Sequence, residues 1–211
     1  MKNPRPVKIK ICGMTSARDA AYAADLGADA VGLIFFKKSP RAVTEAQARK
    51  ILDGLPPLVH RVGVFVNESA ERINRLVDRL KLDRVQLHGE ESPAFCKTIR
   101  AQVFKAVRVQ NADSLKGLNR YPVRGFLLDA FHPAHYGGTG AVFDWRLAHR
   151  AKKAGPIILA GGLTPENVAE AIERVRPYGV DVCSGVEKRP GRKDYEKLRA
   201  FFDAVRGANQ E

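Results

Sequence analysis

The sequence predicts a closed barrel of eight parallel β-strands surrounded by helices, the α/β fold called a (β/α)8 or TIM barrel. Short β-branched runs recur roughly every 20 to 30 residues, and segments with helical spacing of Ala, Leu, Val and Ile separate them. Strict strand-helix alternation implies a parallel sheet, because each crossover helix returns the chain to the same end. Eight units with no leftover segment favour a closed barrel. A Rossmann-like open sheet is the alternative, although no GxGxxG opens its first helix.

The expected strands are short apolar runs of the kind that pack in a buried parallel sheet. In chain order they are Val7–Ile11, Ala30–Phe35, Arg61–Phe65, Arg84–Leu87, Val103–Ala106, Gly125–Asp129, Pro156–Ala160 and Val180–Cys183.

Each expected helix opens at or near a residue whose side chain can cap it. These residues are Ser16, Thr44, Ser69, Ser92, Asp113, Asp144, Thr164 and Asp194. Pro165 is expected in the first turn of its helix, and Gly27 is expected to end the first helix before the next strand.

Length and composition indicate one domain over residues 1–211, large enough to bury one core, with 45% hydrophobic residues. No segment approaches the roughly 18 apolar residues that span a bilayer, and the basic N-terminus lacks the apolar stretch of a signal peptide. Cys12, Cys96 and Cys183 form no CxxC pair, which suits a reducing compartment. We therefore expect a soluble cytoplasmic protein with no membrane contact and no metal.

The formal charge of +13 raises the question of an anionic partner. Lys and Arg are spread along the chain and alternate with acidic residues in the expected helices, and no nucleic-acid-binding motif accompanies them. We expect no nucleic-acid binding, although a basic non-catalytic barrel that binds nucleic acid stays open as an alternative. Basic residues at the expected barrel mouth can steer an anionic small molecule, while most of their side chains are expected in solvent. These are Lys37, Lys38, Lys188, Arg189, Arg192 and Lys193.

In a (β/α)8 barrel the functional groups lie at the carboxyl ends of the strands, and Cys12 stands there after the first strand. Side chains alternate along a strand, so Lys10 and Cys12 face the barrel interior while Ile9 and Ile11 face the helices. A nearby lysine is expected to help lower the pKa of the thiol and provide thiolate as a base. Lys10 is expected to be balanced by Asp181, because strands one and eight are neighbours in a closed barrel.

Asp129 ends the sixth expected strand, nearly across the barrel from Cys12. A carboxyl group at the barrel mouth, next to apolar walls, is suited to act as an acid. The two side chains therefore form a candidate base and acid on opposite sides of one substrate.

Glycine-rich loops follow the sixth, seventh and eighth strands: Gly137-Gly138-Thr139-Gly140, Gly161-Gly162 and Ser184-Gly185. Glycine lets backbone N–H groups approach an anion closely, and this fold commonly holds phosphate at its last strands. A single Gly-Gly pair is more often a simple turn, but three such loops in succession favour a phosphate site.

Taken together, these residues resemble the phosphoribosylanthranilate isomerase family of tryptophan biosynthesis. The resemblance covers nearly the whole chain. Its motifs are Lys8-Ile9-Lys10-Ile11-Cys12-Gly13-Met14-Thr15, Val85-Gln86-Leu87-His88-Gly89, Leu128-Asp129, Ala160-Gly161-Gly162-Leu163 and Asp181-Val182-Cys183-Ser184-Gly185-Val186-Glu187. Cys183 departs from the family, in which serine is more common at this position.

The resemblance implies a cofactor-free Amadori rearrangement of N-(5-phosphoribosyl)anthranilate to 1-(2-carboxyphenylamino)-1-deoxyribulose 5-phosphate. Cys12 would be the general base and Asp129 the general acid. Arg41 would meet the anthranilate carboxylate, and His88 and Asp181 would line the substrate site, although His88 and Gln86 could simply complete the barrel mouth. Backbone N–H groups at Gly140, Gly162, Ser184 and Gly185 would hold the phosphate. A monomer or a homodimer is equally compatible with the sequence.

The related isomerase of histidine biosynthesis is the nearest enzymatic alternative. That family resembles a barrel with an aspartate in place of the cysteine, and its substrate carries two phosphates. The single compact set of glycine loops in this chain favours one phosphate.

Overall fold

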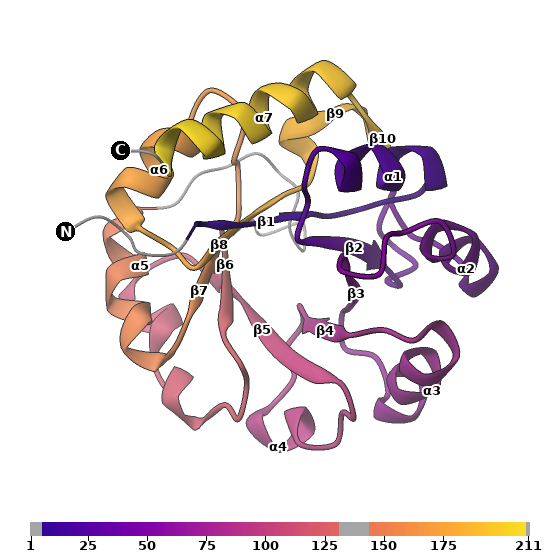
Figure 1. Ribbon diagram of the computed structural model, residues 1–211. Helices are drawn as coiled ribbons and strands as arrows, with labels where there is room; N and C mark the ends of the chain where they lie inside the picture. Colours follow the sequence, from indigo (N-terminus) through magenta and orange to yellow (C-terminus); the bar gives the residue numbers. More distant parts are fainter. Residues whose placement is uncertain (1–5, 131–143, 210–211) are drawn as a thin grey trace.

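The computed structural model describes residues 6–130 and 144–209, and it contains the closed eight-stranded parallel barrel that the sequence predicts. Each strand pairs with the next, and β8 pairs with β1 to close the sheet. The strands lie at the centre of the molecule and the helices surround them (Figure 1). The strand bounds are β1 Lys8–Ile11, β2 Ala30–Ile34, β3 His60–Phe65, β4 Arg84–Leu87, β5 Gln102–Val109, β6 Phe126–Ala130, β7 Ile157–Leu159 and β8 Gly179–Val182.

The helices follow the strands as expected, and several begin at the predicted caps. They are α1 Ala17–Asp25, α2 Glu45–Leu52, α3 Ala70–Leu80, α4 Pro93–Cys96, α5 Arg146–Ala151, α6 Val168–Val175 and α7 Tyr195–Ala208. Side chains of Ser16, Thr44, Ser69, Ser92 and Asp194 accept hydrogen bonds from the first-turn N–H groups. Gly27 follows α1 with φ of 96°, as its predicted terminator. None of the helices in these ranges is long and apolar enough to cross a membrane.

Three helix predictions need correction. The segment near Asp113 forms two 3-10 turns, η1 Ala112–Leu115 and η2 Leu118–Arg120, because Gly117 between them is left-handed with φ of 75°. α6 starts after Asn167, not at Thr164. The Asn167 side chain folds back onto the preceding loop, where its Oδ1 accepts from Thr164 N–H at 2.9 Å. Pro165 therefore lies before the helix.

The third correction concerns α5, which begins at Arg146 after Trp145 rather than directly at Asp144. Asp144 still serves this end of the helix, because its Oδ1 accepts from Arg146 N–H at 3.0 Å.

Alternation along the strands divides the buried side chains into two layers. Ile9, Ile11, Phe126 and Leu128 belong to the large layer between sheet and helices. Inside the barrel a smaller cluster contains Val62, Phe104, Ala106, Leu127 and Ala160. Because Leu127 faces inward, Asp129 two residues later faces the interior as well. The same alternation turns Lys10 and Cys12 inward on β1.

The C-terminal segment closes the outer ring. A hairpin of β9 Glu187–Arg189 and β10 Arg192–Lys193 follows β8 and the 3-10 turn η4 Ser184–Val186, and α7 then lies between α6 and α1 (Figure 1). Tyr195 of α7 stacks on Tyr22 of α1 with ring centroids 4.2 Å apart. The first and last helices thus pack against each other.

Candidate active site

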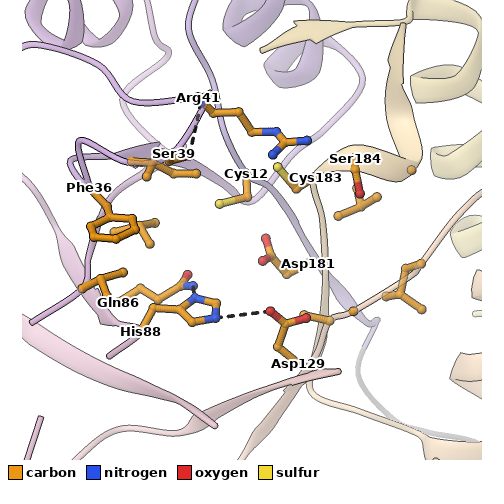
Figure 2. A pocket seen from close by; sticks show the side chains of 18 of the residues that line it. Cys12, Phe36, Ser39, Arg41, Gln86, His88, Asp129, Asp181, Cys183 and Ser184 are labelled. Carbon is orange, nitrogen blue, oxygen red and sulfur yellow. Dashed lines mark hydrogen bonds and ion pairs between the residues drawn. The ribbon is translucent and has the colours of Figure 1, made fainter. Parts of the chain in front are cut away.

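A cavity of about 310 Å³ opens at the carboxyl ends of the barrel strands. Every predicted site residue among those the structure describes lines it; Gly140 lies outside the described residues. Figure 2 shows Cys12, Asp181 and Asp129 facing this space from different strands. The predicted residues brought together here are Cys12, Arg41, His88, Asp129, Gly162, Asp181, Ser184 and Gly185.

The expected pairing below the candidate base is confirmed. Lys10 Nζ donates to Asp181 Oδ1 at 2.7 Å, and both residues are buried. Burial opposes the charge on Lys10, but Asp181 and the nearby Cys12 thiol outweigh it and raise the pKa of the amine. Lys10 is therefore a fixed cation beneath Cys12, compensated by Asp181.

The expected effect of Lys10 on the Cys12 thiol is outweighed by a second thiol. The backbone register continues past β1, where Cys12 N–H donates to Val182 O at 2.8 Å, so Cys12 lies beside Cys183. A hydrogen bond to Cys183 and burial raise the pKa of Cys12 well above its ordinary value, although Lys10 acts in the opposite direction. Lys10 lowers the pKa of Cys12 as predicted, but its effect is smaller than those of the hydrogen bond to Cys183 and of burial.

The partner thiol moves the other way. The hydrogen bond from Cys12 and the charges of Lys193 and Arg41 lower the pKa of Cys183 to about 7, against the effect of burial. The two thiols are hydrogen-bonded to each other and therefore titrate as a pair. The sequence signal for this pair was the cysteine at a position where the family usually has serine.

Asp129 lies beside an imidazole on the opposite wall. His88 Nε2 is 3.2 Å from Asp129 Oδ2, a close ion-pair contact outside hydrogen-bond geometry. Gln86 Nε2 is 2.8 Å from His88 Nδ1 and fixes the ring from behind. Figure 2 shows this row of three side chains crossing the lower part of the cavity. His88 therefore lies close enough to Asp129 to orient its carboxyl group.

Arg41 lies at the rim and is buried, but its partner was not predicted. Its Nη2 donates to Glu187 Oε2 at 2.7 Å, and its Nε donates to the same carboxylate. Glu187 is in turn 3.2 Å from Nζ of Lys193. Most basic residues of the mouth are expected in solvent, but Lys193 is buried. Glu187 and Lys193 belong to the hairpin after β8, and neither glycine spacing nor strand alternation predicts which hairpin side chains point into the site.

Exposed cations surround this buried group. Lys37, Lys38, Lys188, Arg189 and Arg192 are exposed, as predicted. Lys193 is thus the exception among the basic residues of the mouth.

The glycine loops after β7 and β8 approach each other closely. Gly161 and Gly162 have φ of 80° and 66°, a conformation that glycine adopts without strain. A Cβ at Gly185 would lie 1.9 Å from the carbonyl oxygen of Leu163. Glycine is therefore required where the two loops touch, and this contact brings Gly162 and Ser184 to the same wall of the cavity.

The sequence and the fold match one family of enzymes. The profile of the family described as N-(5'phosphoribosyl)anthranilate (PRA) isomerase matches residues 9–204. The N-(5'-phosphoribosyl)anthranilate isomerase of Citrifermentans bemidjiense is 55% identical over 92% of this chain and 95% of its own length.

Solved structures agree. The phosphoribosyl anthranilate isomerase of Thermotoga maritima superposes with a TM-score of 0.89 at 43% identity, covering 95% of this chain and 99% of that chain. A phosphoribosyl anthranilate isomerase solved in complex with reduced 1-(o-carboxyphenylamino)-1-deoxyribulose 5-phosphate has a TM-score of 0.86 at 42% identity, with the same coverage.

Proposed function

Because the chain belongs to the N-(5'-phosphoribosyl)anthranilate isomerase family, its reaction is the isomerisation of phosphoribosylanthranilate in tryptophan biosynthesis, and we propose that Cys12 and Asp129 carry the proton transfers. The observation that supports this assignment is their placement on different walls of one buried cavity. The isomerase of histidine biosynthesis and a non-catalytic nucleic-acid-binding barrel are not retained.

In the first step, Asp129 gives its proton to the ribose ring oxygen. The bond between that oxygen and the first carbon breaks as the nitrogen lone pair forms a Schiff base. Asp129 is buried, and His88 stands 3.2 Å away to orient it and return a proton. The substrate nitrogen supplies the electron sink, so proton transfers suffice.

In the second step, Cys12 takes the proton from the second carbon of the sugar. The electron pair of that bond passes to the Schiff base and gives an enolamine, which tautomerises to the aminoketose. Cys12 must act as thiolate, and the neighbouring charge of Lys10 favours that form. The base and acid then act on neighbouring positions of one ring-opened sugar.

The remaining predicted residues bind the two anionic ends of the substrate. Arg41 would receive the anthranilate carboxylate, since a guanidinium fork matches a planar carboxylate. Backbone N–H groups at Gly162, Ser184 and Gly185, together with Gly140, would hold the phosphate. Asp181 would line the floor of the site with its charge held by Lys10.

The direct test is the fluorescence decay of phosphoribosylanthranilate generated in situ, with wild type beside Cys12→Ala and Asp129→Asn. We expect both variants to fold and to lose about a hundredfold or more in kcat, as is typical when an acid or base is removed. Variants that turn over at the wild-type rate would show that other groups perform the proton transfers.

We further propose that residues 1–211 form one domain that works in the cytoplasm as a monomer or a homodimer. The three free thiols fit a reducing compartment. Leu58 lies beside a cavity at the opposite end of the barrel and is 90% exposed. A monomer leaves this apolar side chain in water, whereas a homodimer that used this end would bury it. Sedimentation velocity separates the two states.

A further inference from the structure

The guanidinium of Arg41 is held along one edge only. Its Nε lies 3.0 Å from each oxygen of Glu187, and its Nη2 donates to Oε2 at 2.7 Å. Within the part of the chain that the structure describes, Nη1 makes no hydrogen bond. A guanidinium has five N–H donors in a planar fork. Glu187 therefore occupies the side-on edge and leaves the end-on edge available to a second planar anion.

The local backbone is shaped for this arrangement. Gly13 has φ of 72°, and a Cβ there would lie 2.7 Å from Cδ of Arg41. The arginine stem thus crosses the end of β1 in space that only glycine leaves open. Arg41 lies in the loop after β2 and Glu187 begins β9, 146 residues later, so their contact is a product of barrel closure.

Glu187 is fixed in turn by Lys193. Lys193 Nζ donates to the carbonyl oxygen of Cys12 at 2.7 Å and to that of Cys183 at 3.0 Å, and it pairs with Glu187 Oε1 at 3.2 Å. The Lys193 side chain is 1% exposed and that of Glu187 is 3% exposed. Glu187 therefore has little freedom to follow Arg41 elsewhere.

While the Cys183 thiol keeps its proton, below about pH 7, the charges of this cluster leave one positive charge uncompensated. Arg41 and Lys193 contribute two, and Glu187 removes one. A buried charge is costly unless it is paired. A substrate carboxylate on the end-on edge of Arg41 would neutralise the cluster and find its donors already oriented.

We propose that Glu187 is a positioning residue for substrate selection, which holds the side-on edge of Arg41 so that the end-on edge recognises the aromatic carboxylate. The inference rests on the proposed role of Arg41. It assigns Glu187 no contact with the substrate. Its effect is on the preference for ligands that carry the carboxylate.

The experiment compares two probes by titration calorimetry. One is reduced 1-(o-carboxyphenylamino)-1-deoxyribulose 5-phosphate, and the other is the same compound without the carboxyl group. The readout is the ratio of their Kd values, the carboxylate preference. A purely structural role for Glu187 would weaken both probes together and leave the ratio unchanged.

We expect Glu187→Gln to reduce the carboxylate preference about tenfold, the scale of a hydrogen bond to a charged group, while the carboxyl-free probe binds nearly as before. Glu187→Asp keeps the charge but is one methylene shorter, so it should give an intermediate loss and serves if Glu187→Gln does not fold. Glu91→Gln is the matched control. Glu91 is a buried glutamate paired with buried Lys105 at 3.2 Å, without an arginine partner, and its variant should keep the wild-type ratio.

Arg41→Met separates the two hypotheses. If it leaves the ratio unchanged, the proposed role of Arg41 fails. If Arg41→Met abolishes the preference while Glu187→Gln and Glu187→Asp both retain it, the role of Glu187 is overturned and that of Arg41 stands. A fall in the ratio for both Glu187 variants, with no change for Glu91→Gln, supports the inference.

Discussion

At the scale of single residues, the environment of each thiol decides which one holds the proton. Cys12 has a balanced pair of opposite charges, Lys10 and Asp181, beneath it. Cys183 has Arg41 and Lys193 near it, with Glu187 compensating only in part. The raised pKa of Cys12 disfavours the thiolate that a base needs, while the charge of Lys10 favours it.

Cys183→Ser should remove a titration near neutral pH. The lowered pKa of Cys183 means that its thiolate is present above about pH 7 and is lost as the pH falls below that value. Absorbance at 240 nm between pH 5 and 9 should therefore show a thiolate step near pH 7 in wild type and none in Cys183→Ser. Because a serine hydroxyl stays neutral in this range, Cys12 no longer donates to a thiolate in this variant, and the rise of kcat/KM with pH should also move to lower pH.

Cys96→Ser is the matched control, because Cys96 is a buried thiol outside the site whose pKa is raised by burial. It should retain the step near pH 7. A step of the same size in Cys183→Ser would mean that Cys12 or another group titrates there.

Strand alternation explains which site residues were predictable. Cys12, Asp129 and Asp181 lie on or directly after strands, where period two assigns each side chain to one face. Glu187 and Lys193 lie in the hairpin after β8, and no periodicity tells which of its charged residues turn inward. The basic residues of this segment look alike in sequence, yet only Lys193 among those expected at the mouth is buried.

At the scale of elements, a buried lysine joins neighbouring strand ends at two places in the barrel. Lys193 reaches the carbonyl groups that follow β1 and β8. Lys105 of β5 donates to Leu87 O at 3.2 Å and to Gly89 O at 2.7 Å, at the end of β4. Buried carbonyl groups just beyond the end of a strand have no partner in the sheet. They need such donors, because unpaired buried polar groups are costly.

Lys193→Met should therefore destabilise the fold as well as the site. The variant leaves the carbonyls of Cys12 and Cys183 without this donor and removes one partner of a buried ion pair. Losses of about 3 kcal/mol are typical of such a change. Urea unfolding followed by circular dichroism measures the difference, and Lys188→Met, which removes an exposed lysine of the same hairpin, should stay within about 0.5 kcal/mol of wild type.

The helices were less predictable than the strands for a related reason. Capping side chains indicate where helices begin. Five predicted caps are confirmed: Ser16, Thr44, Ser69, Ser92 and Asp194. Near Asp113 the local cap is Asn111, and Gly117 ends the segment after one short turn. A capping residue indicates where a helix can begin but does not ensure its length, which depends on the packing face that follows.

At the scale of the whole molecule, the net charge of +13 should act on association and not on chemistry. Exposed cations Lys37 and Lys38 lie beside the cavity, so raising the salt concentration from 20 to 300 mM should lower kcat/KM for the anionic substrate and leave kcat nearly unchanged. Stopped-flow fluorescence at several salt concentrations measures this slope.

Lys37→Glu with Lys38→Glu should flatten the salt dependence. Lys81→Glu with Arg124→Glu, which reverses charges at the opposite end of the barrel, serves as the control and should change the slope less. If both double variants change the salt dependence of kcat/KM equally, the net charge of the whole protein attracts the substrate and Lys37 and Lys38 do not steer it to the mouth.

Barrel closure has a consequence for how the protein is made. β1 pairs with β8, and the carbonyl of Cys12 receives its hydrogen bond from Lys193, 181 positions later. During synthesis, the segment that carries Cys12 is made well before β8 and Lys193, so these contacts cannot form until those later residues have emerged. Contacts of such long sequence separation form slowly. A nascent chain that stops before Lys193 therefore cannot assemble this site.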